Sequence, residues 1–402
     1  MGKFVSKFKE EIIFKLILGV ALGLLLGFVA SEAVMEIVVC VKEILGQLIF
    51  FTVPLIVLGF IAPSIAELKS GASKMLSFAV AIAYISTLGA AIFSMVAGYA
   101  IVPFLSIQSA VEGLKEVPEA FFTIAIDPLF SVMSALVLSI MLGLAVSATK
   151  SETLGKGLSE FRNVILKVIN HLILPILPFF IATTFSILAY EGSITAHLPV
   201  FIIAIATVIV GHFIWLAVLY IVAGIYSGEN PKEVFKHYAP AYFTAVGTMS
   251  SAATLPVSLK CAGKSDVLSK ESVDFGVPLF ANIHLCGSVL TEVFFVMIVS
   301  QILYGTLPTL SNMILFVVLL GIFGIGAPGV PGGTVMASLG LITGVLGFDA
   351  TGTALIMTIF ALQDSFGTAC NVTGDGALTL MLSKFSNKIA LKQDSQTQEI
   401  SE

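Results

Sequence analysis

The stretch Gln363–Gly376, with the sequence QDSFGTACNVTGDG, lies inside an apolar segment near the C-terminus. Its spacing of Asp364, Thr368, Asn371 and Asp375 places all four on one stripe of a helix with about 3.6 residues per turn. Two carboxylates on one face of a membrane helix are costly, and they persist only where they face a cavity, a partner or a ligand. We therefore expect the rest of the chain to enclose this stripe.

The composition is that of a polytopic membrane protein. Of the 402 residues, 57% are hydrophobic and only 11% are charged. Soluble domains carry about 25% charged residues, so this chain has too little charge to cover a water-exposed surface. We expect membrane lipid around it and no nucleic-acid partner.

The cysteines have no CxxC spacing, and they lie in apolar or loop surroundings. This pattern indicates neither a zinc site nor a disulfide framework and favours small buried side chains. We expect no cofactor, and no metal other than sodium. The four cysteines are Cys40, Cys261, Cys286 and Cys370.

Several apolar segments have the length of about 20 residues that crosses a bilayer. The expected spans are Ile12–Ala30, Val34–Ile65, Met75–Leu105, Phe121–Ala148, Val164–Ala189, Leu198–Ile225, Val277–Tyr304, Ile314–Leu346 and Thr353–Ser383.

The basic residues predict the orientation. Lys69 and Lys74 follow the second segment, and Lys150 and Lys156 follow the fourth, so they share one side if the first six spans alternate. By the positive-inside rule that side is the cytoplasm. We expect a multi-pass protein of the plasma (inner) membrane with both termini cytoplasmic. No cleavable signal peptide is expected, because the first apolar run has the length of a span.

Two segments of the second half are interrupted. Ala239–Lys264 is rich in small residues and has a polar tip at Ser250–Thr254, whereas Ile314–Leu346 contains GAPGVPGG with Pro328 and Pro331. Irregular backbone at membrane depth is tolerated where it is buried in protein or lines a cavity. Interrupted segments in matching places of two halves indicate a transporter's binding site. A proline-kinked ordinary span is the alternative for the second segment.

The motifs SSAATLP at Ser250–Pro256, PGVPGG at Pro328–Gly333 and NVTGD at Asn371–Asp375 occur in this order. Each motif is weak alone, but their combination resembles the dicarboxylate/amino acid:cation symporter family, the glutamate-transporter homologues, over the whole chain. The resemblance implies an all-α polytopic membrane protein with eight transmembrane helices and two re-entrant helical hairpins. It further implies a scaffold, an elevator-type transport domain and assembly as a homotrimer.

The resemblance also implies a division of the chain. The expected parts are scaffold helices 1 and 2 at 1–74, transport-domain helix 3 at 75–118, scaffold helix 4 at 119–163, scaffold helix 5 at 164–196, transport-domain helix 6 at 197–238, the first re-entrant hairpin at 239–264, helix 7 at 265–304, the second re-entrant hairpin at 305–349, and helix 8 with a polar tail at 350–402.

By the same resemblance, the substrate is an amino acid. Asp364 matches the position whose carboxylate holds the substrate ammonium. Thr368 and Asn371 match neighbours that hydrogen-bond the substrate, and Ser288 is expected at the same site.

The two hairpin tips are expected to hold the substrate α-carboxylate. The first tip would contribute Ser250 and Ser251, and the second the backbone around Val330 and Gly332. Free N–H groups at helix N-termini favour such an anion.

Gly367 departs from the pattern of acidic-substrate members, which have an arginine at this position. The chain contains a single arginine, Arg162, in a loop region. Without a guanidinium, a buried second carboxylate of the substrate would be unpaired and costly. We therefore predict a neutral amino acid as the substrate, and we expect Gly367 to leave room for its side chain.

The coupling ion is the second point of departure. Where sodium-coupled relatives have an asparagine and an aspartate, this chain has His284 and Cys286. A sodium site from Asp375 and carbonyls near Phe280, His284 and Asn371 stays open, because hard cations prefer oxygen ligands. Histidine changes charge near neutral pH, so we expect sodium coupling to be reduced or replaced by protons. Alternatively, neutral His284 only fills space.

The sequence leaves two other transport functions open. One is a sodium-coupled symporter of acidic amino acids or dicarboxylates, and another is an anion channel, although no continuous set of pore-lining charges is evident. An enzyme is not expected, since no histidine or lysine has a reason to lie beside Ser250 and Ser251. Glu292, inside a predicted span, is interpreted as a polar anchor or a gate.

Overall fold

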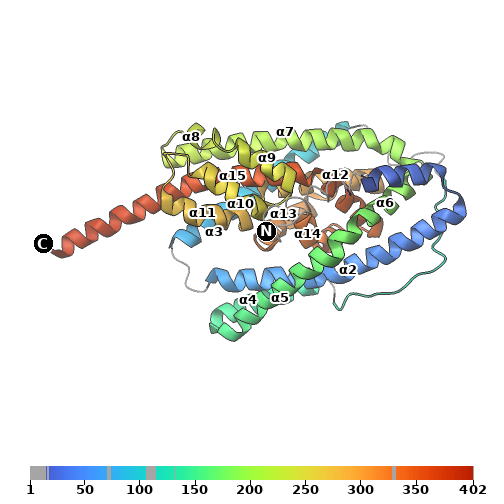
Figure 1. Ribbon diagram of the computed structural model, residues 1–402, viewed down its shortest axis with the longest axis horizontal. Coiled ribbons are helices and arrows are strands. Elements are labelled where there is room, and N and C mark those ends of the chain that lie inside the picture. Colours follow the sequence, from blue (N-terminus) through green and yellow to red (C-terminus); the bar gives the residue numbers. More distant parts are fainter. Residues whose placement is uncertain are drawn as a thin grey trace.

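The apolar segments fold as helices, which satisfy their own backbone hydrogen bonds where water is absent. The computed structural model describes residues 15, 18–69, 74–105, 115–130, 132–327 and 332–401, and all regular structure in these ranges is helical (Figure 1). The elements are α2 (Glu32–Lys69), α3 (Lys74–Ile101), η1 (Val102–Phe104), α4 (Val132–Thr149), α5 (Glu152–Val168), the π-helical η2 (Ile169–Ile173), α6 (Leu174–Glu191), α7 (Ser193–Ser227), α8 (Lys232–Phe235), α9 (Ala239–Thr248), α10 (Ser251–Ala262), α11 (Lys270–Ile283), α12 (Cys286–Tyr304), α13 (Leu310–Gly326), α14 (Gly333–Gly344) and α15 (Ala350–Ser401).

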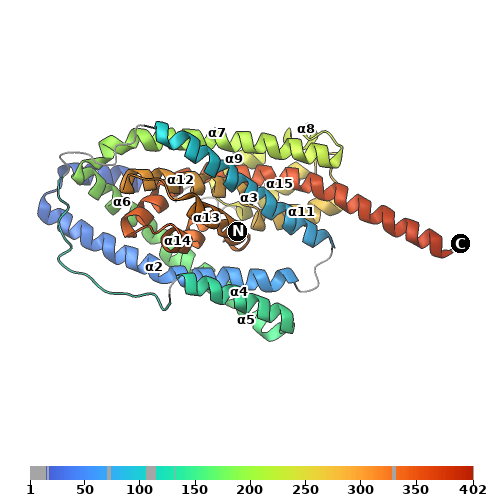
Figure 2. The same ribbon diagram turned by 180° about the vertical axis from the view of Figure 1, so that it is seen from behind.

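The helices pack in two groups (Figures 1 and 2). Helix α2 packs against α4, α5 and α6, whereas α12 and α15 pack against each other and against α3 and α7. The four-residue stripe lies in the second group, on α15. The expected division into a scaffold and a moving transport domain stays a prediction.

A short helix, Leu18–Val29, precedes α2 and crosses α6 closely. A Cβ atom on Gly23 would lie 2.3 Å from the carbonyl oxygen of Ala182, and one on Gly27 would lie 2.2 Å from that of Ser186. The Ser186 hydroxyl donates to the Gly23 carbonyl at 2.8 Å. Small residues allow this close approach of backbones, as is common between membrane helices.

The interrupted segments each form two helices. Helices α9 and α10 pack against each other across a turn at Met249, whose φ of 49° is left-handed. Helices α13 and α14 also pack together, while Pro328–Pro331 between them lie outside the described residues.

Among the described residues, five helices are long and apolar enough to cross a membrane. The count becomes six if Glu152–Ile173 and Pro178–Glu191, bent by 49°, form one broken span. The multi-pass character is therefore confirmed, whereas eight spans and the re-entrant entry of the hairpins stay predictions.

The expected span Phe121–Ala148 is wrong in its first part. Residues 121–130 are not helical, and α4 begins only at Val132. The non-helical segment runs along α2, where the Ile126 N–H donates to Gln47 Oε1 at 2.8 Å and the Phe122 N–H to Cys40 Sγ at 3.4 Å. Side chains of α2 thus satisfy backbone groups that a helix would have paired internally.

The expected span Val277–Tyr304 is not one helix. Helix α11 ends at Ile283, His284 is extended with φ −114° and ψ 109°, and α12 begins at Cys286. By contrast, the expected last helix is continuous, since α15 runs through the whole stripe.

Candidate substrate and cation site

The site is built around the break between α11 and α12. The first N–H groups of α12 have no partner within their own helix. Asn371 on α15 supplies an acceptor for two of them, because its Oδ1 accepts from the N–H groups of Gly287 at 2.7 Å and Ser288 at 3.2 Å. Its Nδ2 donates to Ser288 Oγ at 2.9 Å. Asn371 therefore caps α12 from a neighbouring helix, and Ser288 is part of that cap.

His284, in the break, is linked through its ring to two other helices. Its Nδ1 lies 2.9 Å from Asp375 Oδ1 on α15, and its Nε2 lies 2.9 Å from Ser86 Oγ on α3. His284 and Asp375 are 0% and 1% exposed. Asp375, at the C-terminal end of the stripe, thus has an imidazole as its partner.

Asp364, at the other end of the stripe, contacts the second hairpin. Its Oδ2 accepts from the N–H of Gly332 at 2.7 Å. Thr368 lies one turn further along α15. Both residues are buried. Gly332, which the sequence placed at the second tip, thus lies directly against Asp364, whereas Val330 lies outside the described residues.

Gly367 and Gly287 let α15 and α12 cross closely. A Cβ on Gly287 would lie 2.4 Å from the Gly367 carbonyl oxygen, and a Cβ on Gly367 would lie 3.2 Å from Ser288 Cα and 3.3 Å from Ser288 N. The expectation that Gly367 leaves room for a substrate side chain is therefore wrong, because the first turn of α12 fills the space beside it.

The residues predicted to bind a cation are partly engaged with one another. The carbonyl oxygen of Phe280 accepts from the His284 N–H at 2.9 Å, and Asp375 Oδ1 contacts the imidazole. Cys286 is fully buried, and its Sγ lies 4.0 Å from the Cys370 carbonyl oxygen. A sodium ion here would have the second oxygen of Asp375 and backbone carbonyl oxygens as ligands. In place of a second carboxylate it would meet the thiol of Cys286. This donor set fits sodium poorly.

The first hairpin presents the predicted serines at a helix N-terminus. Ser250 is the N-cap of α10, and its Oγ accepts from the Ala253 N–H at 3.2 Å. Ser251 begins the helix, and both serines are buried. Helices α9 and α10 pack on α15, so this tip belongs to the same helix group as the stripe.

The structure adds two polar contacts that sequence reasoning did not pair. Glu292 is fully buried on α12, and its Oε1 accepts from the Ser338 hydroxyl on α14. His212 on α7 is buried, with Nε2 3.0 Å from both the Gly287 carbonyl oxygen and Thr291 Oγ1. Polar residues inside apolar helices are the only sequence signal for either pair. A group of three or more residues arranged to hold a metal ion does not occur among the described residues.

A protein-family comparison places this geometry in context. The model of the sodium:dicarboxylate symporter family matches residues 12–385. The chain belongs to this family of symporters.

Particular relatives are excitatory amino acid transporters. Human excitatory amino acid transporter 3 is 30% identical over 184 residues, covering 46% of this chain and 35% of that protein. Mouse excitatory amino acid transporter 3 is 30% identical over 160 residues, which cover 40% of this chain and 30% of the relative. Mouse excitatory amino acid transporter 2 is 30% identical over 173 residues, covering 42% and 29%. The matched stretch of this chain thus spans about a third of the length of these relatives.

Proposed function

We propose that this protein is a secondary active symporter of neutral amino acids. The observation that carries the proposal is the environment of Asp364, a buried carboxylate that accepts a hydrogen bond from the Gly332 N–H and has no positively charged partner among the described residues. A substrate ammonium would supply the positive charge that a buried carboxylate needs. Asp364 would bind that ammonium, Thr368 and Asn371 the polar groups beside it, and the hairpin tips the α-carboxylate.

The proposed preference for a neutral substrate rests on the absence of a positively charged side chain from this part of the sequence. The sequence contains neither lysine nor arginine from Glu271 to Ser383, which includes α12, both limbs of the second hairpin and the stripe. Position 367 is glycine, and Ser288 fills the space beside it. A side-chain carboxylate of aspartate or glutamate would enter this site without a charged partner.

Uptake into proteoliposomes tests substrate choice. Radiolabelled alanine or serine is expected to accumulate, and unlabelled alanine, serine or leucine to compete better than aspartate or succinate. Stronger competition by aspartate than by every neutral amino acid would overturn the proposal.

For coupling, we propose that His284 reduces the need for sodium and that protons replace it. The titratable groups facing His284 are Asp375 on α15 and Cys286 on α12, with Tyr220 of α7 close to Asp375. In its protonated form, the imidazolium would place a fixed positive charge beside Asp375, where a cation would otherwise bind.

Four ionic conditions separate the coupling ions. Uptake is measured with and without an inward sodium gradient, each with and without an inward proton gradient. We expect the proton gradient to drive accumulation without sodium. The double variant His284→Asn with Cys286→Asp restores oxygen ligands and is expected to gain sodium stimulation. Strict sodium dependence of the unaltered protein would defeat the coupling proposal and leave the substrate proposal standing.

The wider architecture also belongs to this proposal. It comprises eight spans, two re-entrant hairpins, an elevator movement of the second helix group, a homotrimer and cytoplasmic termini. The packing of α9, α10, α13 and α14 into hairpins supports it.

A second candidate is a sodium-coupled symporter of acidic amino acids or dicarboxylates. The family description and the names of the excitatory amino acid transporters favour it. Aspartate-dominated competition together with strict sodium dependence in the two assays above would select it.

A further inference from the structure

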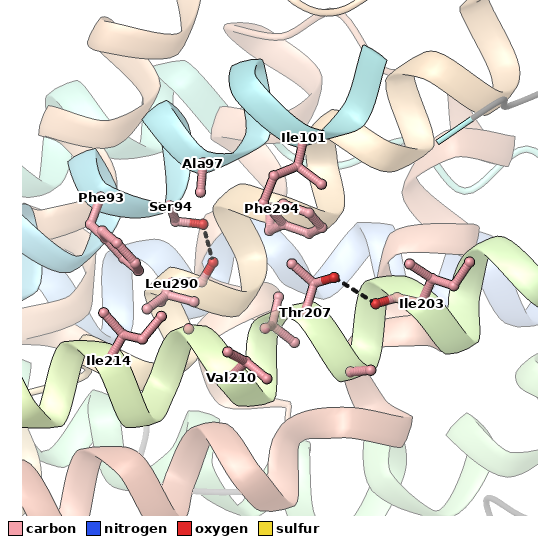
Figure 3. A pocket seen from close by; sticks show the side chains of 13 residues that line it. Phe93, Ser94, Ala97, Ile101, Ile203, Thr207, Val210, Ile214, Leu290 and Phe294 are labelled. Atoms are coloured by element: carbon pink, nitrogen blue, oxygen red, sulfur yellow. Dashed lines mark hydrogen bonds between the residues drawn. The ribbon is translucent and has the colours of Figure 1, made fainter. Parts of the chain in front are cut away.

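An apolar groove lies on the outer face of the second helix group, away from the stripe. Helices α3, α7 and α12 form it, and its volume is about 370 Å³. Figure 3 shows side chains of α3 and α7 pointing toward each other across the groove, with Leu290 and Phe294 of α12 between them. Leu290 and Phe294 are 2% and 1% exposed, so they form its floor.

The lining contains no charged side chain and no free hydroxyl. Ser94 Oγ donates to the Leu290 carbonyl oxygen at 2.6 Å, and Thr207 Oγ1 donates to the Ile203 carbonyl oxygen at 2.8 Å. An occupant would therefore meet only apolar surface and hydroxyls that already have partners. This chemistry excludes amino acids and ions as ligands of the groove.

The rim faces the bilayer. Ile203, Val210 and Ile214 of α7 are 47%, 59% and 46% exposed, and they lie in one of the helices long and apolar enough to span a membrane. The medium around such a rim is hydrocarbon, so the molecules that meet the groove are lipid chains. Lys74 begins α3, and Lys232 follows the end of α7, whereas the groove is lined by the last part of α3 and mostly by the first half of α7. The groove therefore lies in the half of the membrane away from these lysines.

The length of the groove fits one leaflet. Between Ile203 and Ile214 the axis of α7 advances about 16 Å, at about 1.5 Å per residue. One leaflet contributes half of a hydrocarbon core that is about 30 Å thick. The groove is thus about as long as a leaflet's hydrocarbon layer, and a single chain lying along α7 would remain within it.

We propose that the groove between α3 and α7 binds one acyl chain of a membrane phospholipid, distinct from the substrate site. A bound chain contacts α12 at Leu290, one turn beyond the cap that Asn371 forms with Gly287 and Ser288. The lipid would therefore lie against the helix that carries half of the broken span.

Photo-crosslinking of the full chain in bilayers tests this site. The probe is phosphatidylcholine with a diazirine in the middle of one acyl chain, and adducts are located by mass spectrometry after illumination. We expect adducts at groove residues to exceed those at Ile221, Val222 and Ile225 by at least about threefold. These three residues are exposed apolar side chains on the same helix, so they report unspecific contact with lipid.

A matched pair of substitutions gives the control. Ala206→Leu adds bulk inside the groove, whereas Ala217→Leu makes the same change eleven residues along α7, on the same helix face but outside the lining. We expect Ala206→Leu to reduce groove adducts severalfold and Ala217→Leu to leave them unchanged.

Three results would overturn the proposal. The first is that groove residues and Ile221, Val222 and Ile225 are labelled equally in the unaltered protein. The second is that the groove is labelled equally in the Ala206→Leu and Ala217→Leu variants. The third is that a diazirine fatty acid labels the groove and the phospholipid does not. If Ala206→Leu does not fold, the distribution of adducts along α7 in the unaltered protein decides the question. Crosslinks between two copies of the chain at the groove, with no lipid adducts, would also contradict it.

Discussion

The two aspartates of the stripe are chemically identical, but their partners differ. Asp364 accepts a hydrogen bond from a backbone N–H of the second hairpin, at Gly332. Asp375 is held by the imidazole of His284 in the break between α11 and α12. A backbone N–H at a hairpin can be exchanged for a ligand group, whereas an imidazole anchored by Ser86 remains in place. One end of the stripe is thus suited to binding a substrate, and the other end has a partner supplied by the protein.

The largest effect is expected for Asp364→Asn. The amide oxygen can still accept from Gly332, so the hairpin contact remains, but the charge that would bind an ammonium is lost. Hydrogen bonds to charged groups contribute about 1.5–3 kcal/mol, which corresponds to about a 10- to 100-fold weaker apparent substrate affinity. Substrate-dependent thermal stabilisation and uptake measure the loss.

The control for Asp364→Asn is its thermal stability without substrate. We expect it to equal or exceed that of the unaltered protein, because a buried charge has been removed. Unchanged uptake in the folded variant would contradict the assignment of Asp364 to the substrate ammonium.

Asp375→Asn probes the other end and reports the charge of His284. Breaking a buried ion pair costs about 3–5 kcal/mol, whereas loss of a neutral buried hydrogen bond costs about 1–3 kcal/mol. If His284 is charged in the native protein, we expect the larger loss in the free energy of unfolding. Denaturant titration in detergent is carried out on Asp375→Asn, on His284→Asn and on the variant with both of these substitutions. The three free energies of unfolding isolate the coupling between the two residues.

The comparison with Asp364→Asn defines the result that would contradict the prediction for Asp375→Asn. Asp375→Asn is expected to change the ion dependence of uptake more than the apparent substrate affinity. A variant that loses substrate binding as completely as Asp364→Asn, with unchanged ion dependence, would remove the distinction between the two ends.

Asn371 lies between the two ends, and its substitution is expected to act through α12. Asn371→Ala removes the acceptor for two N–H groups, and loss of a helix cap costs about 0.5–2 kcal/mol. Asn371→Asp keeps an acceptor at the N-terminus of α12, where the helix dipole favours a negative charge. We expect the alanine variant to be the less stable of the two in thermal denaturation, and the reverse order would exclude a capping role.

The sequence predicts the stripe because its signal is local. A helix period brings Asp364, Thr368, Asn371 and Asp375 onto one face, and α15 is continuous through all four. The two hairpins are similarly signalled by proline, glycine and a polar tip.

The other features of the fold and the site depend on contacts between segments that are distant in the sequence, and residue periodicity does not predict such contacts. The break at His284 has no proline beside it, so the cap from Asn371 and the pairing with Asp375 could not be read from residue spacing. The segment 121–130 is apolar enough for a span, but α2 side chains pair with its backbone instead. The glycine at position 367 suggested free space, and only the position of α12 shows that the space is filled.

The smallest effect is expected for Gly367→Ala. Alanine in a helix is favoured over glycine by about 1 kcal/mol, whereas overpacking at a tight contact costs about 1–3 kcal/mol. A new Cβ would lie 3.2 Å from Ser288 Cα, a contact that a shift of a few tenths of an ångström relieves. We therefore expect Gly367→Ala to change the free energy of unfolding by less than about 1 kcal/mol, with neutral substrates still preferred.

Gly367→Arg extends the same test to substrate choice. A guanidinium near the stripe would supply the missing partner for a second carboxylate, but its Cβ starts against the backbone of Ser288. Because α12 closes this side, the substitution alone is expected to impair uptake of neutral amino acids without creating efficient aspartate uptake. Competition by aspartate, measured beside Gly367→Ala, separates the two effects. Efficient aspartate transport by Gly367→Arg would show that charge at this position, and not the close crossing of α12 and α15, sets the preference for neutral substrates.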